Sequence, residues 1–308
     1  MKTLISIIGP TGIGKTKLTI FLAKYFKTEI ISCDSRQFYK ELNIGTSKPS
    51  IKQLKIIKHH FISHISILNK YNIYKYENDV LLLMNKLFLK YNIIFLVGGS
   101  LLYEKTVIEG LNFIPKIKGE GKKKLNKYLK KKNIKYLLKK LKKLDIIYYK
   151  NLKNKNNKKK LIKDLIIIYL TKKNITYFYK KKKKPRPFNN FLRIILIEKR
   201  EKIYKNINYK VDKMIKKGLI KEVKVIHKKY KKLNLKSLNT IGYKEVFKYL
   251  EGKKNIEESI YEIKKNTRNY AKKQISWLKN KIKSDNAIYI NPKKKKKILN
   301  IIKKKIFL

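Results

Sequence analysis

A glycine-rich stretch directly after an apolar run constrains the fold more than any other feature of this sequence. The run LISIIG leads into GPTGIGKT, which fits the pattern G-x-x-x-x-G-K-[ST]. In that pattern, backbone amides surround phosphate oxygens at the start of a helix. The sequence therefore predicts a phosphate-binding loop, with a glycine-rich turn that binds no ligand as the alternative. The loop residues are Gly9, Pro10, Thr11, Gly12, Ile13, Gly14, Lys15 and Thr16.

The order of the predicted elements indicates an α/β fold. The runs LISIIG, TEIISCDS and NIIFLVGGS are typical of buried strands, and helices are predicted over 15–26 and about 101–109. Strands that alternate with helices favour a P-loop-type parallel sheet flanked by helices. Ligands of such sheets bind beyond the carboxyl ends of the strands. The glycine-rich loop, Asp34 and residues 98–100 all lie at such ends, so we expect them to converge on one crevice.

The chain changes character after about residue 114. Lysine-rich runs with helical periodicity and few acidic residues predict a small helical insertion domain over 115–187, with a partly disordered linker as the alternative. FLRIILIEK returns to a strand pattern, and the C-terminal portion from Arg200 onward is predicted to be mostly helical, ending in a peripheral basic helix. We therefore predict a catalytic core made of residues 1–114 and 188–308, interrupted by the insertion.

The charge of the chain is extreme. Lys and Arg number 81 against 20 Asp and Glu, a formal net charge of +61. This charge indicates a polyanionic partner, with nucleic acid as the first candidate. The alternative is a codon bias, because Lys, Ile, Asn and Tyr are all over-used. Under such a bias the surviving arginines mark sites that need a flat, forked guanidinium. They are Arg36, Arg186, Arg193, Arg200 and Arg268.

Several classes of protein are excluded by composition. The single cysteine, Cys33, excludes an internal disulfide and a cysteine-rich metal site, and it favours a reducing cytoplasm. The four histidines form no familiar metal-ligand motif. No apolar run reaches the roughly 18 residues that span a membrane. We therefore expect a soluble, cytoplasmic protein that is a monomer and has no membrane partner.

Two further segments carry candidate functional residues at the predicted crevice. Asp34 follows the second strand, where a carboxylate could bind Mg²⁺ through water or accept a proton from a nucleophile; a simple turn residue is the alternative. Its neighbours Ser35, Arg36, Gln37 and Phe38 combine hydrogen-bonding and stacking side chains, as a base-recognition loop does. Gly98 and Gly99 permit close approach of a backbone, and Ser100 suits a helix cap or a phosphate contact.

Taken together, these motifs resemble those of the tRNA dimethylallyltransferase family, which prenylates adenosine beside the anticodon. The resemblance runs from Lys2 to about Lys279. It rests on six landmarks that occur in order with spacing close to that of the family. They are GPTGIGKT, CDSRQFYKELNIGTSKPS, HHFISHIS, VGGSLLY, the run REKIYKNINYKVDKMIKKGLIKEV with IGYKE, and TRNYAKKQISWLKN.

The resemblance implies a mechanism and a set of partners. The loop would hold the diphosphate of dimethylallyl diphosphate rather than a nucleotide to be cleaved, and the target adenine would be flipped out of the tRNA anticodon stem-loop into a channel. Asp34 would be the general base on the exocyclic amine. Thr16 and Arg200, with Mg²⁺ at Thr16, would stabilise the departing diphosphate. This assignment suits the chemistry, because the amine is a poor nucleophile and the leaving group gains negative charge.

The resemblance also implies contacts with tRNA. Asp34, Ser35, Arg36, Gln37 and Ser100 match positions that touch the RNA, and Arg268 lies within a matching motif. The family's arginine-rich helix corresponds to KKLIKDLIII, where Lys159, Lys160 and Lys163 replace Gln and Arg and preserve the charge. The family's Asp after the His-His pair is Ser63 here.

Two other functions remain open at this stage. A small-molecule or nucleotide kinase also pairs a phosphate loop with an Asp after the second strand, but it leaves the basic helical second half unexplained. A nucleic-acid-binding module with a decayed active site fits the charge. The presence of Lys15, Thr16, Asp34 and Arg200 argues against decay.

Overall fold

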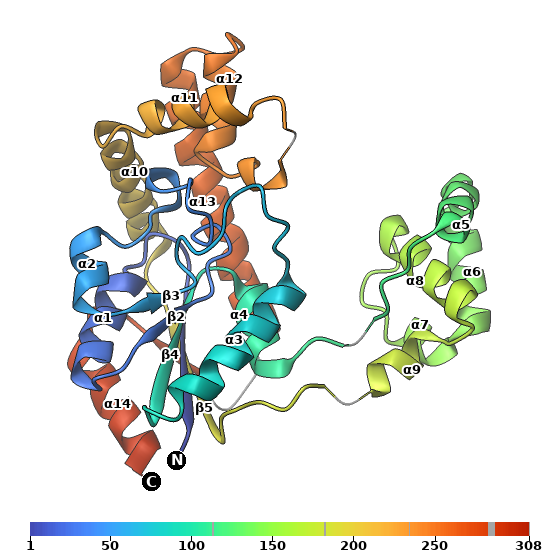
Figure 1. Ribbon diagram of the computed structural model, residues 1–308, viewed down its shortest axis with the longest axis horizontal. Coiled ribbons are helices and arrows are strands. Elements are labelled where there is room, and N and C mark those ends of the chain that lie inside the picture. The colour runs from blue at the N-terminus through green and yellow to red at the C-terminus, as the bar shows by residue number, and fades with distance from the viewer. Residues whose placement is uncertain (113, 182, 234, 283–286, 308) are drawn as a thin grey trace. The chain divides into compact units, whose positions relative to one another are not determined.

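The computed structural model describes residues 1–112, 114–181, 183–233, 235–282 and 287–307, and it divides into two compact units, Met1–Glu109 with Arg186–Leu308, and Gly110–Pro185. The first unit is built on a six-stranded, all-parallel sheet of order β3-β2-β4-β1-β5-β6 (Figure 1). Its strands are β1 (Thr3–Ile8), β2 (Ile30–Ser32), β3 (His59–His60), β4 (Ile93–Gly98), β5 (Asn190–Leu196) and β6 (Ala287–Ile290). The α/β class predicted from the sequence is therefore confirmed.

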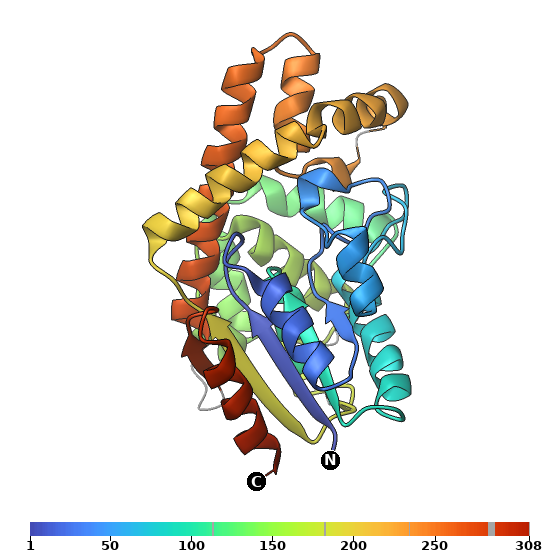
Figure 2. The ribbon, with the colours of Figure 1, turned by 90° about the vertical axis from the view of Figure 1, so that its left-hand side faces the viewer.

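Helices cover both faces of this sheet, which is why its central strands are apolar on both sides. One face packs on α1 (Lys15–Tyr25) and α14 (Lys295–Phe307), which lie side by side in Figure 2. The other face packs on α3 (Ile73–Leu87) and α4 (Leu101–Glu109). The basic terminal helix expected at the periphery is thus part of the core, because Ile298 and Ile302 on α14 are fully buried.

A second group of helices extends the first unit beyond the carboxyl ends of the strands (Figure 1). They are α10 (Arg200–Lys216), α11 (Leu219–Tyr230), α12 (Tyr243–Leu250) and α13 (Ile256–Lys281). Helix α13 begins at a capping box formed by Asn255 and Glu258, which satisfies backbone amides of its first turn. Its middle packs on α10 and α12, and Leu278 near its end joins the core beside β1 and β5.

The second unit is wholly helical and has a core of its own. It contains α5 (Glu120–Lys131), α6 (Ile134–Leu144), α7 (Ile146–Lys150), α8 (Lys158–Thr171) and α9 (Ile175–Lys180). Two buried aspartates organise it: Asp145 accepts hydrogen bonds from the first turns of both α7 and α9, and Asp164 accepts one from the Tyr148 hydroxyl at 2.7 Å. The lysine-rich segment therefore folds as helices rather than as a linker.

The remaining short elements connect these parts. They are the 3-10 helices η1 (Ile44–Thr46) and η2 (Lys236–Leu238) and the helix α2 (Ile51–Ile56). Strands β3 and β6 were not predicted from the sequence; the second lies in a stretch expected to be mostly helical. Among the helices of the described ranges, none combines the length and the apolar character that crossing a bilayer requires.

Candidate active site

The glycine-rich loop joins β1 to α1, as its pattern predicts. Gly14 is the N-cap of α1 and has a left-handed backbone, φ 97°, which a residue with a side chain rarely adopts. The Lys15 amine donates to the carbonyl oxygens of Gly9 and Pro10, both at 2.9 Å. Thr16 lies in the first turn of α1 with its hydroxyl free of protein partners among the described residues. The loop thus presents amides, a cation and a hydroxyl at one helix N-terminus.

Asp34 lies just beyond the carboxyl end of β2, beside this loop. Its carboxylate oxygen Oδ1 accepts a hydrogen bond from the Arg36 amide at 3.1 Å, and its carbonyl accepts one from the Gln37 amide at 3.0 Å. Asp34 therefore does stabilise a turn, as the alternative interpretation predicts. Its second carboxylate oxygen, Oδ2, nevertheless faces the crevice. An added Cβ at Gly99 would lie 3.9 Å from Oδ2 and 3.8 Å from the Lys15 amine. Gly99 therefore marks the point where the Asp34 carboxylate and the Lys15 amine approach each other.

Gln274 on α13 closes the crevice by bridging two loops. Its Oε1 accepts a hydrogen bond from the Thr11 amide at 2.9 Å, and its Nε2 donates to the Gly99 carbonyl at 2.7 Å. A side chain at position 99 would collide with this amide, because its Cβ would lie 2.7 Å from Nε2. Glycine is thus required there for close approach. Sequence reasoning assigned this segment to helix packing and missed Gln274, because only the docking of α13 reveals which of its faces meets the loops.

The segment after Ser100 is tied to the segment after Asp34. The Ser100 hydroxyl accepts a hydrogen bond from the Ser35 amide at 3.0 Å and lies 3.1 Å from the Ser35 hydroxyl. Gln37 donates from its side chain to the carbonyls of Thr46 and Ser47. Ser35 and Gln37, predicted to contact tRNA, therefore also hold the local backbone.

Lys48 stabilises the segment that follows Asp34 through three hydrogen bonds. Its amine donates to the Tyr39 carbonyl at 2.5 Å, to Asn43 Oδ1 at 3.0 Å and to the Ser63 hydroxyl at 2.7 Å. Burial lowers the pKa of Lys48 to about 8, although the carboxylates of Glu222 and Glu41 oppose the shift. The serine that replaces the family's aspartate at position 63 thus receives one of the three hydrogen bonds of this lysine.

The electrostatics of the crevice are dominated by two lysines that face one carboxylate. Burial lowers the pKa of Lys15 to about 8, while Asp34 acts to raise it and Lys210 acts to lower it. Burial also lowers the pKa of Lys210 on α10, again opposed by Asp34. Lys210 is a crevice residue that the sequence did not single out, since it is one lysine among 76. Two desolvated cations beside the loop favour the binding of a small polyanion.

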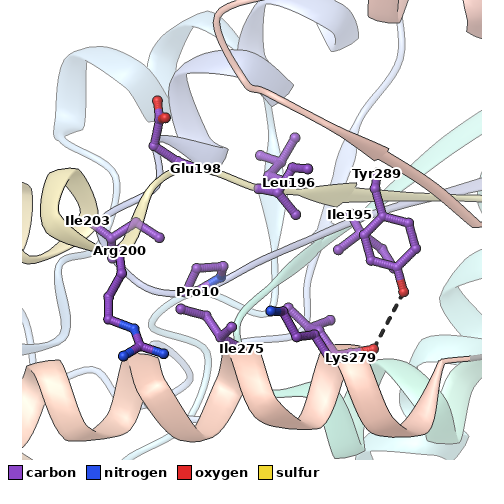
Figure 3. A pocket seen from close by; sticks show the side chains of 11 residues that line it. Pro10, Ile195, Leu196, Glu198, Arg200, Ile203, Ile275, Lys279 and Tyr289 are labelled. Carbon is purple, nitrogen blue, oxygen red and sulfur yellow. Dashed lines mark hydrogen bonds between the residues drawn. The ribbon is translucent and has the colours of Figure 1, made fainter.

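An apolar pocket of about 440 Å³ opens next to Pro10 at the carboxyl end of β5 (Figure 3). Arg200, the first residue of α10, and Lys279 on α13 lie on either side of Ile275 in this view. Neither cation has a hydrogen-bond or ion-pair partner within the described ranges. The pocket therefore combines an apolar wall with free positive charge. Its lining residues are Pro10, Ile195, Leu196, Ile197, Glu198, Arg200, Ile203, Ile275, Leu278, Lys279 and Tyr289.

The other arginines divide into two groups. Arg36 adjoins the crevice, where its charge lowers the pKa of Tyr39, Tyr103 and Tyr270 against the larger effect of burial. Arg268 donates to Asn208 Oδ1 at 2.7 Å, between α13 and α10. By contrast, Arg186 pairs with Glu77 at 2.5 Å and Arg193 pairs with Glu104 at 2.8 Å. The surviving arginines thus include two that stabilise the fold.

The three predicted lysines of α8 lie in the second unit and differ from one another. Lys159 and Lys163 are exposed. Lys160 is half-buried, and its amine is held by the Tyr148 hydroxyl and by Asp164. Lys159 and Lys163 can therefore contact a phosphate group of a binding partner, whereas the amine of Lys160 is already held within the unit. The second unit carries 28 lysines against three acidic residues, of which two are buried.

The side chains of the crevice are compatible with Mg²⁺ only if the substrate supplies most of its ligands. No group of three His, Cys, Asp or Glu gathers among the residues that the structure describes. The Thr16 hydroxyl and the Asp34 carboxylate remain as oxygen donors near the loop. Mg²⁺ commonly binds through one or two protein oxygens together with substrate phosphates and water. The donor set therefore fits a metal that arrives with a phosphate compound.

Comparison with known sequences identifies one family. The sequence model of that family, described as IPP transferase, matches residues 37–281. A protein of Christiangramia forsetii named tRNA dimethylallyltransferase is 46% identical over 276 residues, which cover 90% of each chain.

Solved structures show the same similarity in three dimensions. The full-length tRNA isopentenylpyrophosphate transferase of Bacillus halodurans has a TM-score of 0.73 and 30% identity, and the match covers 99% of this chain and 97% of that one. A eukaryotic dimethylallyltransferase, solved acting on tRNA, also has a TM-score of 0.73, with 26% identity over 90% of this chain and 70% of the other. The similarity therefore extends over both units.

Proposed function

The chain belongs to the IPP transferase family, and on that premise we propose that it transfers a dimethylallyl group from dimethylallyl diphosphate to a tRNA adenosine. The acceptor is the exocyclic amine of an adenosine next to the anticodon, and diphosphate is released. Family membership makes the chain an enzyme, a tRNA dimethylallyltransferase. The observation that carries the chemistry is that the Lys15 amine and the Asp34 carboxylate both lie within 4 Å of the position that a Cβ on Gly99 would occupy.

The donor binds by its diphosphate at the glycine-rich loop. The amides at the start of α1, the Lys15 amine and Lys210 supply positive charge on one side, and Arg200 supplies it on the other. The pocket of Figure 3 borders the loop at Pro10 and offers isoleucine and leucine side chains to a hydrocarbon chain. This arrangement suits a molecule with a small apolar group joined to a diphosphate.

The acceptor approaches from the side of Asp34. The nitrogen of the exocyclic amine forms a bond to the first carbon of the prenyl group while the bond from that carbon to the diphosphate oxygen breaks. The amine proton passes to the Asp34 carboxylate, and the electron pair of the broken bond leaves with the diphosphate. Lys15, Thr16 and Arg200 stabilise the charge that develops there, because their positions are fixed before reaction.

Mg²⁺ would bind at the same site together with the diphosphate. Thr16 is the residue that would hold it, by its hydroxyl oxygen, while the diphosphate and water would supply the other ligands. When bound, it would neutralise part of the charge of the leaving group. The deprotonation of the amine by Asp34 does not depend on that role.

The RNA partner is an anticodon stem-loop. Arg36 and Ser100 border the crevice, and the exposed Lys159 and Lys163 belong to a unit with a large excess of positive charge. Phosphate contacts supply most of the affinity of such surfaces. The target base must leave its stack to reach Asp34, as enzymes that act on bases require.

Incubation with radiolabelled dimethylallyl diphosphate, Mg²⁺ and unmodified tRNA tests this function. We expect label to enter RNA and to be found on adenosine after digestion. A parallel reaction with γ-labelled ATP and small acceptors serves as the comparison. Phosphate transfer without prenylation would instead establish a kinase, and binding of tRNA without either reaction would indicate a binding module.

A further inference from the structure

Helix α13 presents two side chains to the crevice on one face. Gln274 contacts the loops through Thr11 and Gly99, as described above. Tyr270 lies four residues earlier, and residues four apart lie on the same face of a helix. Tyr270 therefore reaches the rim of the crevice about one turn away from the position of Gln274.

The surroundings of Tyr270 are those of the acceptor side. Its hydroxyl lies near Ser100, and the charges of Asp34 and Arg36 both act on it. Burial, together with the Asp34 carboxylate, raises the pKa of Tyr270 to about 12, so the phenol stays protonated at neutral pH. The hydroxyl end thus lies beside the proposed general base.

The ring of Tyr270 remains partly accessible to solvent. The residue is 40% exposed. Most other rings near the crevice, such as Phe38, Tyr76 and Tyr103, pack on one another. Within the described residues, the ring of Tyr270 makes no such ring–ring contact. An aromatic face that lies at the rim of the crevice, partly open to solvent and without a ring partner, suits the stacking of a base.

We propose that the ring of Tyr270 stacks on the flipped target adenine and so presents its exocyclic amine to Asp34. The inference rests on the function proposed above. Stacking on an aromatic side chain stabilises a nucleobase by an amount equivalent to about 5- to 150-fold in affinity. A stacked base lies parallel to the ring, so the plane of the Tyr270 ring determines the plane of the adenine. Tyr270 is thus a substrate-contacting residue that determines the orientation of the base.

A double-mutant cycle between the protein and the RNA tests this stacking. Affinities are measured for two anticodon stem-loops that differ only at the target position, adenosine in one and an abasic site in the other. The proteins are the parent, Tyr270→Leu, Tyr270→Phe and Tyr261→Leu. Tyr261 is a matched control, since it is an exposed tyrosine on the same helix, nine residues from Tyr270.

We expect the parent, Tyr270→Phe and Tyr261→Leu to prefer adenosine by at least tenfold, and Tyr270→Leu to lose this preference. Single-turnover prenylation should fall in Tyr270→Leu and be retained in Tyr270→Phe. Unchanged affinity for dimethylallyl diphosphate in Tyr270→Leu shows that the fold and the loop are intact.

Two results would overturn the proposal. One is equal binding of adenosine and abasic RNA by the parent. The other is a full preference for adenosine in Tyr270→Leu, which would exclude the ring as the stacking surface. If the parent does not prenylate tRNA at all, the proposed function fails instead, so the two failures are distinguishable.

Discussion

Arg193 donates from Nε to Glu104 Oε1 at 2.8 Å, and this ion pair is buried against the central strand of the sheet. The same carboxylate oxygen accepts a hydrogen bond from the Ser6 hydroxyl at 2.8 Å. Arg193 belongs to β5, Ser6 to β1 and Glu104 to α4, so the pair joins two strands and one helix. Burial raises the pKa of Glu104, and the guanidinium of Arg193 opposes that shift.

Removal of one partner of this pair should be costly, whereas removal of both should not. Arg193→Met should lower the free energy of unfolding by about 3–5 kcal/mol, because it leaves the Glu104 carboxylate buried and uncompensated. The double variant Arg193→Met, Glu104→Leu should recover most of that loss. Urea unfolding measures both. Lys105→Met, which breaks the exposed pair with Glu109, is the control and should change stability by about 1 kcal/mol at most. Equal losses in the single and double variants would contradict this account.

The Lys15 amine should matter for the donor and not for the fold. Lys15→Ala should weaken binding of dimethylallyl diphosphate by about 10- to 100-fold, the range expected for a hydrogen bond to a charged group. Thermal stability should change little, since the two hydrogen bonds of the amine go to carbonyls of its own loop. Titration calorimetry with donor and with inorganic diphosphate gives both affinities. Donor affinity equal to that of the parent would remove the loop from donor binding.

Asp34→Asn keeps the shape of the side chain and removes the proton acceptor. General bases typically contribute about 10²- to 10⁴-fold, so single-turnover prenylation should fall by that order. Affinity for tRNA should change little, because the site already accepts a polyanion. Unfolding should also be unaffected, since the Arg36 amide can donate to the asparagine oxygen. A variant that prenylates at nearly the parent rate would exclude Asp34 as the base.

His64 should make the fold sensitive to mild acid. Both ring nitrogens are buried and have no hydrogen-bond partner among the residues that the structure describes, and Phe38, Phe61 and Tyr71 surround the ring edge-on at 5.1–5.3 Å. Burial lowers the pKa of His64, with Asp79 opposing. The folded chain then binds fewer protons than the unfolded one below pH about 6.5, so stability falls as the pH falls through that value.

The slope from one such group is at most about 1.4 kcal/mol per pH unit. His64→Phe should remove this part of the pH dependence. The difference in unfolding free energy between parent and variant, followed from pH 7.5 to 5, isolates it from His59, whose pKa is also lowered by burial. Parallel curves for the two proteins would show that His64 does not titrate in this range.

The excess charge should appear as a steep salt dependence of tRNA binding. Each phosphate neutralised releases condensed counterion, so log affinity should fall linearly with log salt concentration. Lys163→Gln should make the slope shallower by about 0.7–0.9. Lys297→Gln on α14 is a control of equal charge change on an exposed lysine. A flat dependence would mean that the charge reflects codon bias on a solvated surface.

The parts of this molecule that the sequence predicted depend on local pattern. The loop, α1 and α4 follow from glycines and apolar runs whose meaning does not depend on distant residues. Asp34 and Ser100 could be placed near the loop because all three follow strands, and parallel strands end at the same edge.

The remaining features depend on contacts between distant segments. Strand β3 has only two residues, His59 and His60, and no strand pattern can appear in so short a run. Gln274 and Tyr270 lie on a helix with polar residues on several faces, and its docking alone shows which face meets the crevice. Arg193 could be singled out as an arginine but not as a partner of Glu104, since 89 residues separate them.

The hydrogen bonds of Gln274 also determine when, during synthesis, the phosphate loop reaches its final geometry. Thr11 and Gly99 are tethered by a residue that the ribosome adds 263 positions after the first of them. At a synthesis rate of about 5–20 residues per second, the nascent chain would wait about 13–53 seconds with its phosphate loop unbraced. A chain released before α13 is synthesised would contain every residue of the loop. It would lack the Gln274 side chain that links Thr11 to Gly99. Premature termination near the 3′ end of the message would thus yield a protein that has the motif without its geometry.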